Sequence, residues 1–298
     1  MNNIPPMTNM TSSGLPRRHF LSTFACTGAL AALTPSVRAV SPTPRPGRLK
    51  QSVCRGVFKD AKLDLNGMCR EAARLGIVGI DFVGPADFPT LREYGLTPTM
   101  VSGGSGIKKG INDLKNHAEI EPKLREAIKT AGAAGVPNVI VMAGDRAGIS
   151  DEQGFENCIV FLNKIKSLAE DSNVTLCMEL LNSKVDHPGY MCDHTAWGVK
   201  LCKAVDSPRF KLLYDIYHMQ IMEGDIIRTI RDNIQYIGHF HTAGNPGRHA
   251  FDETQELYYP PICKAIADLG YQGYFAHEYT PTKDALLTLE KMLKICEV

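Results

Sequence analysis

The feature that most constrains the fold is a repeated alternation of short β-branched runs with amphipathic helical patterns, which begins near residue 52. Eight runs have the length and composition of buried strands: residues 52–58, 77–82, 97–102, 138–143, 175–180, 211–214, 236–241 and 273–278. Helical patterns between them cover residues 66–75, 119–134, 153–172, 195–205, 226–233 and 259–269, and a last one covers 283–296. Strands that alternate with helices predict repeated βαβ units and a parallel sheet.

Two architectures are built from such units, a doubly wound open sheet and a closed barrel. Dinucleotide-binding open sheets carry a G-x-G-x-x-G turn after the first strand, and none is found there. The glycine-rich segment 103–106 follows the third strand and opens no clear helix. The count of units and the final helix therefore favour an α/β fold, a closed (β/α)8 barrel of the TIM-barrel type, as a single domain over residues 52–298.

The first 39 residues have the order of parts of an export signal. Arg17 and Arg18 form a twin-arginine pair, a modestly apolar run covers residues 20–33, and Val37-Arg38-Ala39 resembles a cleavage site. The apolar run is too short to span a bilayer. The sequence thus predicts a twin-arginine-type signal peptide at 1–39, a proline-containing linker at 40–51, and export to the periplasm without stable membrane insertion.

Charge and cysteine content limit the partners of the chain. The 33 Lys and Arg residues nearly equal the 32 Asp and Glu residues, which leaves a net charge of +1. Such a balance gives no broad electrostatic attraction to nucleic acid or anionic lipid. The nine cysteines are scattered without a C-x-x-C pair, so neither a zinc site nor a disulfide framework is indicated. The expected partners are a small-molecule substrate or a second copy of the chain in a homo-oligomer, and no nucleic acid.

Four consecutive predicted strands end in residues of the kind that bind metal ions. In β/α barrels the active site lies at the C-terminal ends of the strands, and the last four strands lead into Glu179, Asp215, His241 and Glu278. Each alone has an ordinary explanation, such as an acid that caps the next helix. Together, unpaired carboxylates at one barrel mouth would be costly without a cation between them. This predicts one divalent ion, Mn²⁺ or Mg²⁺, with Co²⁺ as a third option.

The alternation of side chains along a strand sorts the neighbouring residues. His239 shares a face with His241 and is expected one layer deeper, in the core or behind the metal ligand. His277 should face the helices. His218 is expected in the loop after the sixth strand, within reach of a ligand at the mouth. Arg248 is expected in the loop after the seventh strand, where it could bind an anionic or hydroxyl-rich substrate or remain a solvated arginine.

The motifs at these strand ends resemble one known family. They are Glu179-Leu180-Leu181-Asn182, Tyr214-Asp215-Ile216-Tyr217-His218-Met219-Gln220, Gly238-His239-Phe240-His241-Thr242-Ala243, Pro246-Gly247-Arg248-His249 and Glu278-Tyr279. From about residue 52 onward the chain resembles the hydroxypyruvate isomerases, within the xylose-isomerase-like sugar isomerases and epimerases. The resemblance implies that the four residues named above bind a divalent ion and that the two glutamates form the catalytic acid/base pair. It also implies that Asn182, His218 and Arg248 contact the substrate.

The chemistry of such an isomerase explains this division of roles. Isomerisation of an α-hydroxy carbonyl compound removes a weakly acidic C–H proton and returns a proton to the neighbouring carbon. A metal ion chelated by the carbonyl and hydroxyl oxygens stabilises the cis-enediolate, and carboxylates on opposite sides serve as base and acid. Glu179 and Glu278 lie three strands apart and suit that pair, while Asp215 and His241 mainly hold the ion. The expected reaction converts hydroxypyruvate to tartronate semialdehyde.

Three loop positions depart from the resembled family and keep a second substrate class open. Segment 183–187 is one residue longer, with Lys184 near an expected arginine, Ala250 stands where Glu or Gln is common, and Tyr258 replaces a common asparagine. With export, these changes leave open the alternative of an exported keto-sugar epimerase or isomerase, or a 3-keto-glycoside lyase, with the same metal and glutamate pair. A barrel endonuclease would call for a multi-zinc cluster with more histidines and a basic face. A non-catalytic sugar-binding barrel would not need two opposed glutamates.

Overall fold

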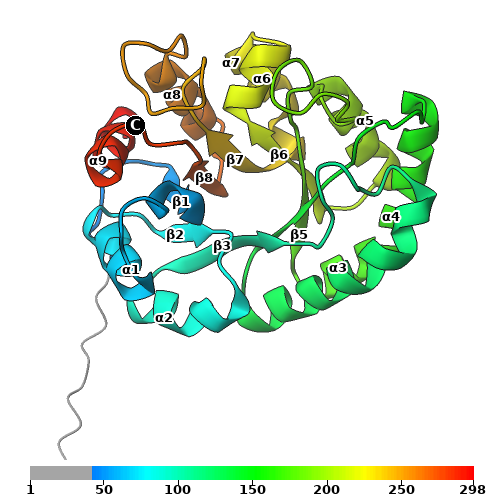
Figure 1. Ribbon diagram of the computed structural model, residues 1–298, viewed down its shortest axis with the longest axis horizontal. Helices are drawn as coiled ribbons and strands as arrows, with labels where there is room; N and C mark the ends of the chain where they lie inside the picture. The colour runs from blue at the N-terminus through cyan, green and yellow to red at the C-terminus, as the bar shows by residue number, and fades with distance from the viewer. Residues whose placement is uncertain (1–41) are drawn as a thin grey trace, which may run out of the picture. The chain divides into compact units, whose positions relative to one another are not determined.

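Eight parallel strands form a closed barrel in a computed structural model that describes residues 42–298. The strands follow the chain order, and β1 pairs with β8 as well as with β2. Helices surround the strands, as Figure 1 shows. The predicted (β/α)8 barrel is thereby confirmed, while the predicted signal peptide at 1–39 lies outside the described residues.

The strands and helices have the following bounds. The strands are β1 (Lys50–Cys54), β2 (Gly79–Asp81), β3 (Thr97–Ser102), β4 (Asn138–Val141), β5 (Thr175–Glu179), β6 (Phe210–Asp215), β7 (Ile237–Thr242) and β8 (Tyr274–His277). The α-helices are α1 (Leu65–Arg74), α2 (Phe88–Glu93), α3 (Leu114–Ala134), α4 (Asp151–Asp171), α5 (Thr195–Val205), α6 (Ile216–Met222), α7 (Ile226–Asn233), α8 (Tyr259–Asp268) and α9 (Ala285–Ile295). Short 3-10 helices are η1 (Arg55–Phe58), η2 (Pro85–Asp87) and η3 (Ile234–Tyr236).

The first strand differs from its prediction at both ends. It begins at Lys50, so the last two residues of the predicted linker belong to the barrel, and residues 55–58 form η1 instead of continuing the strand. The segment before it also contacts the barrel domain, since the Thr43 N–H donates to the Ala73 carbonyl at 2.8 Å. Arg45 donates to the Leu75 carbonyl at 2.7 Å and pairs with Glu297. These contacts attach the segment to α1 and to the C-terminus.

Helix α6 was absent from the sequence-based prediction, which placed His218 in a loop. Asp215 caps this helix, because its side chain accepts from the backbone N–H groups of Tyr217 and His218. The helix has only seven residues, and Ile216, Tyr217, His218, Met219 and Met222 are all buried. A short helix that is buried on most sides lacks the amphipathic period by which helices are recognised in a sequence. His218 therefore has a fixed place on the first turn of a helix.

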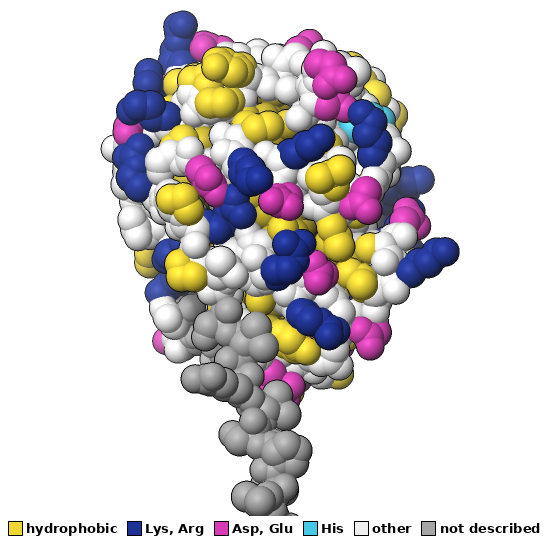
Figure 2. Space-filling model, turned by 90° about the vertical axis from the view of Figure 1, so that its left-hand side faces the viewer, with side chains coloured by type: hydrophobic (Ala, Val, Ile, Leu, Met, Phe, Trp, Pro, Cys, Tyr) yellow, Lys and Arg dark blue, Asp and Glu magenta, His cyan; other side chains and the backbone are white. Residues whose placement is uncertain are grey.

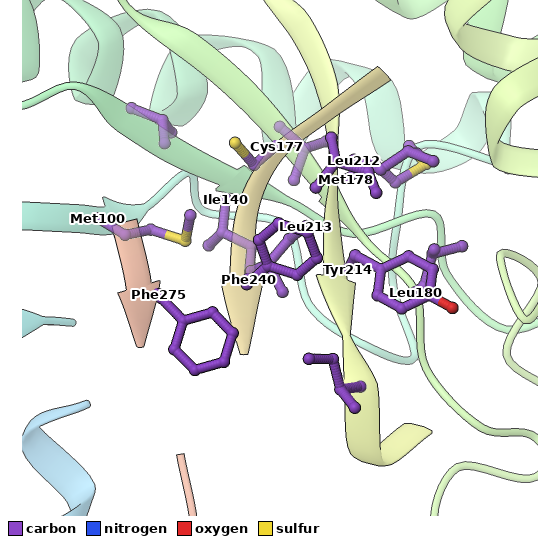
Figure 3. Packing of buried hydrophobic residues seen from close by; sticks show 14 of the residues in the cluster. Met100, Ile140, Cys177, Met178, Leu180, Leu212, Leu213, Tyr214, Phe240 and Phe275 are labelled. Carbon is purple, nitrogen blue, oxygen red and sulfur yellow. The ribbon is translucent and has the colours of Figure 1, made fainter. Parts of the chain in front are cut away.

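The outer faces of the strands carry the apolar packing. Phe240 of β7 is fully buried, and its ring lies 4.9 Å from that of Tyr271 and 6.0 Å from those of Tyr214 and Phe275. Figure 3 shows this part of the core, with Phe240 between Phe275 and Tyr214. His277 also faces outward, as predicted, since it contacts Gln51 and Thr242 at 3.0 Å each. This apolar layer joins the barrel to its helices.

The strand register brings polar residues to one level at the C-terminal end of the barrel. Asp215 pairs with His241 between β6 and β7, and His241 pairs with Ala276 between β7 and β8. Because parallel strands all end on the same side, residues at matched positions share one mouth. The fold thus delivers side chains from four consecutive strands to one place.

Three further features of the described residues concern membrane spans, surface charge and thiols. None of the helices within residues 42–298 combines the length and apolar character needed to cross a membrane. On the face drawn in Figure 2, Lys and Arg side chains are interspersed with Asp and Glu. The cysteines of this described part are all buried, free thiols.

Phe240→Ala is expected to lower the free energy of unfolding by about 3–5 kcal/mol, because it opens a cavity between the barrel and its helices. Urea unfolding followed by circular dichroism measures the change. The control is Leu287→Ala, at a side chain that is 54% exposed, for which a change within about 0.5 kcal/mol is expected. Equal losses for the two variants would contradict this account of the core.

Candidate functional site

The four predicted metal ligands meet at the mouth of the barrel. Glu179 ends β5, Asp215 ends β6, His241 lies near the end of β7, and Glu278 directly follows β8. Each offers one ligand atom, and these four atoms lie within 4.8 Å of one another. Asp215 and His241 are fully buried and Glu179 nearly so, whereas the Glu278 side chain is 27% exposed. The structure therefore brings together all the residues that the sequence singled out for one ion.

His241 presents its Nδ1 atom to the carboxylates. This atom lies 2.9 Å from Glu278 Oε2 and 3.4 Å from Glu179 Oε1, and it makes no well-aligned hydrogen bond. The other ring nitrogen, Nε2, lies 3.0 Å from the carboxylate of Asp81. A buried imidazole nitrogen without a hydrogen-bond partner, surrounded by carboxylate oxygens, is the arrangement that a divalent ion would complete.

The charges of this cluster are only partly balanced by the protein. Burial raises the pKa of Asp215 to about 7, aided by repulsion from Glu278 and Glu179 and opposed by Arg248 and His241. Burial also opposes ionisation of Glu278, but His241 and Arg248 lower its pKa to about 2. Three carboxylates thus share one guanidinium and one imidazole. The donor set fits a divalent cation, which would relieve the repulsion.

Arg248 reaches the cluster from the loop between β7 and α8. Its Nη2 atom lies 2.5 Å from Glu278 Oε2 and 3.3 Å from Asp215 Oδ2. Its guanidinium lies 5.6 Å from the centre of the Tyr217 ring, and its carbonyl accepts from the Thr280 N–H at 2.8 Å. The loop therefore places the Arg248 guanidinium beside the cluster, with 26% of its side chain still exposed.

His218 and Asn182 form a pair next to the carboxylates. His218 Nδ1 accepts from the backbone N–H of Asn182 at 3.2 Å, so the ring proton is on Nε2. That Nε2 atom is buried without a hydrogen-bond partner and lies 3.6 Å from Asp215 Oδ2. The Asn182 side chain contacts His218 and Asp186 and accepts from the backbone of Val185. Asn182 thus orients His218, and its direct contact with substrate stays a prediction.

Asp81 contacts this site and was not among the residues predicted for it. It ends β2, is fully buried, and lies within 3.0 Å of both His239 and His241. His239 was expected one layer below His241, and this contact places it there. The signal was present, because a carboxylate in a strand that is otherwise apolar must have buried partners. Phe82, which follows, has a positive φ of 62° and packs edge-on against the His241 ring.

A cavity of about 570 Å³ opens beside the cluster. Glu278 and Arg248 reach it from the cluster, and Phe82 also borders it. Its remaining wall comes from η1, the start of α1 and the residues after β8. This cavity gives a small molecule access to the carboxylate of Glu278.

The family model described as "Xylose isomerase-like TIM barrel" matches residues 70–295, which include all four clustered residues. The chain belongs to this family. A 2-oxo-tetronate isomerase of Cupriavidus necator is 31% identical over 70% of this chain and 85% of that protein. The hydroxypyruvate isomerase of Escherichia coli K12 is 29% identical over 71% of this chain and 86% of that protein. The predicted resemblance and the isomerase-type enzyme class are confirmed.

Solved structures support the fold alone. An AP endonuclease of family 2 from Brucella melitensis has a TM-score of 0.75 at 24% identity, and covers 83% of this chain and 99% of its own. A 3-keto-D-glucoside 4-epimerase from E. coli has a TM-score of 0.71 at 18% identity, with the same coverage of both chains. At these identities the barrel is shared across different reactions, so the function must be argued from the site.

Asp215→Asn is expected to stabilise the metal-free protein at pH 8. In wild type the folded-state pKa of about 7 lies above the ordinary value of 3.8, so ionisation at pH 8 opposes folding by up to ~4 kcal/mol. As the pH falls through 7 the folded protein takes up the proton and the difference narrows, until it disappears below about 4. Asparagine still caps α6. Urea unfolding with a chelator at several pH values measures the difference.

The matched control is Asp193→Asn, at another buried carboxyl group. Burial opposes ionisation there too, but hydrogen bonds from Ser183, His194 and Arg146 lower the pKa of Asp193. This variant should therefore lose stability at pH 8. The same sign for both variants would contradict the electrostatic account of Asp215.

Proposed function

We propose that this chain is a metal-dependent isomerase that moves a proton between adjacent carbons of an α-hydroxy carbonyl substrate by way of a cis-enediolate. The observation that carries the proposal is the convergence of Glu179, Asp215, His241 and Glu278 at the barrel mouth. This donor set suits Mn²⁺ or Mg²⁺, with Co²⁺ as a third option. Family membership supports the isomerase class.

Asp215 and His241 would mainly hold the ion. Asp215 uses Oδ1 to cap α6, which leaves Oδ2 facing the cluster, and His241 offers Nδ1. When bound, a divalent ion supplies Lewis-acid stabilisation of the negative charge that develops on the substrate's carbonyl oxygen. Because both side chains are fully buried, their orientation is set by the barrel.

The two glutamates would carry the proton. Glu278 lines the cavity and stays ionised beside Arg248 and His241, which suits a base that removes a C–H proton. Glu179 approaches from β5, three strands away, and is 5% exposed. Its shielding from water suits return of the proton to the adjacent carbon without loss to solvent.

His218 and Arg248 would bind substrate oxygens. The Nε2–H of His218 is an unused donor beside Asp215, held in place by Asn182. Arg248 borders the cavity and carries a fixed positive charge. Together they offer hydrogen bonds to hydroxyl, carbonyl or carboxylate oxygens of the substrate.

Hydroxypyruvate is the leading candidate substrate, with tartronate semialdehyde as its product. One relative is named hydroxypyruvate isomerase, and another is named for a related keto acid, 2-oxo-tetronate. Two such names at about 30% identity support a keto-acid substrate for this chain.

The size of the cavity favours a second candidate, a keto-sugar. A three-carbon acid would fill only a small part of about 570 Å³, a volume in the range that takes molecules of drug size. An exported epimerase or isomerase of keto-sugars, or a 3-keto-glycoside lyase, would use the same proton transfer. The predicted twin-arginine export fits this candidate better, since extracellular carbohydrate is a source of such substrates.

A substrate panel distinguishes the two candidates. The chelator-treated protein is assayed with hydroxypyruvate, ketohexoses and 3-keto-glycosides, with and without added Mn²⁺. We expect turnover of one class, loss of at least tenfold in rate after chelation, and recovery with Mn²⁺. Turnover that is indifferent to chelation and to added metal would contradict the proposed metal dependence.

Glu179→Gln and Glu278→Gln test the proton transfer directly. Each should lower the rate of solvent-deuterium incorporation next to the carbonyl by about 10²–10⁴-fold, the usual contribution of a general acid or base. NMR of the recovered substrate measures the exchange. The control is Glu152→Gln on the exposed first turn of α4, which should exchange at the wild-type rate. Wild-type exchange in both site variants would contradict the role of the two glutamates, and absence of exchange in wild type would indicate a binding protein, not an isomerase.

A further inference from the structure

A fully buried hydrogen-bond network lies directly beneath the proposed metal site. Its centre is Asp81 of β2, whose Oδ2 atom is 2.7 Å from His239 Nε2 and 3.0 Å from His241 Nε2. The hydroxyl of Thr99 donates to Oδ1, and the Cys54 thiol lies 3.9 Å from Oδ2. Asp81, Thr99 and both histidines have no exposed surface. The barrel interior thus contains a carboxylate surrounded by donors.

We propose that Asp81 is a positioning residue, which orients His241 and keeps its Nδ1 atom free for the divalent ion. The inference rests on the proposed metal site and adds a residue that lies outside its ligand set. Asp81 acts through His241, since its carboxylate contacts the ring nitrogen opposite the ligand cluster.

The tautomer of His241 follows from the chemistry of the contact. An ionised carboxylate can only accept hydrogen bonds, so the ring nitrogen that faces Asp81 must carry a proton. A ligating imidazole must be neutral, so when an ion binds, the remaining nitrogen gives up any proton and offers a free lone pair. That nitrogen is Nδ1, which faces Glu179 and Glu278. Without Asp81, the proton could move to Nδ1 and occupy the position of the metal bond.

The orientation of the ring is fixed from two further sides. His239 lies edge-on to His241, with ring centres 5.2 Å apart, and Phe82 packs edge-on at 5.8 Å. Phe82 holds a left-handed backbone conformation, with φ of 62°, which a bulky residue adopts only where the surroundings demand it. These contacts leave the His241 ring little freedom to turn away from Asp81.

The distances favour a hydrogen-bond network over a second metal site. Asp81, His239 and His241 could together offer ligand atoms to an ion. However, a tetrahedral ion with bonds of about 2.0–2.1 Å holds its N and O ligands roughly 3.3 Å apart. The 2.7 Å between His239 Nε2 and Asp81 Oδ2 is shorter than that and matches an N–H···O⁻ hydrogen bond.

The test is the affinity for Mn²⁺, measured by the EPR signal of the free ion during titration of the purified protein. Asp81→Asn keeps the size of the side chain but adds N–H donors where acceptors are needed. We expect its Kd for Mn²⁺ to rise about 10–100-fold, the usual effect of losing a carboxylate behind a ligating histidine. The control is Asp193→Asn, the same chemical change at a buried carboxylate that is bonded to Arg146, Ser183 and His194. Its Kd should equal that of wild type.

The outcomes separate this inference from the function on which it rests. If wild type binds no Mn²⁺, the proposed metal site fails. If wild type binds one ion and folded Asp81→Asn binds it equally well, the metal site stands and the role of Asp81 is refuted. Two ions per wild-type chain would make Asp81 a ligand and would likewise overturn its positioning role.

A measurement on wild type covers the case in which Asp81→Asn does not fold. With ¹⁵N-histidine label and bound Mg²⁺, the signal of His241 is assigned by its absence in His241→Gln. We expect a protonated Nε2 and an unprotonated Nδ1. A proton on Nδ1 would overturn the inference.

Discussion

Repulsion among three carboxylates in one buried place is the interaction around which the rest of the site is arranged. Glu179, Asp215 and Glu278 come from three strands, and a low-dielectric interior strengthens their mutual repulsion. The protein opposes it with one guanidinium and one imidazole, both in direct contact with Glu278. A divalent cation would offset the remaining negative charge. The carboxylates that destabilise the metal-free fold by their repulsion are therefore the ones suited to bind the ion.

The barrel divides its two faces between stability and function. The outer faces of the strands are apolar and pack against the helices, as around Phe240. The interior holds Asp81, Thr99 and Asn138, all buried and hydrogen-bonded to partners across neighbouring strands. A polar interior gives up some hydrophobic stabilisation, but its groups rigidly orient the side chains above them. The residues of the mouth are thus supported from below by the interior network.

Much of the fold could be predicted because parallel barrel strands are buried on both faces. Their short runs rich in apolar residues stand out between the helical patterns, and all eight were located, with errors mainly at the ends. Residues 55–58 were misassigned because a short segment that ends in Val57 and Phe58 looks the same in a strand and in a 3-10 turn. Helix α6 was missed because burial of most of its few residues removes the amphipathic pattern. His218 was therefore placed in a loop, although its proximity to a ligand at the mouth was predicted.

The sequence by itself determined which chemical groups end four consecutive strands, because strand order and alternation follow from local patterns. It thereby predicted the cluster of Glu179, Asp215, His241 and Glu278. Only the tertiary structure decided how these groups are supported. The contact of Asp81 with His241 joins residues 160 positions apart, across the barrel from β2 to β7. No local pattern encodes such a contact, since it depends on closure of the barrel and on the shared depth of the two strands.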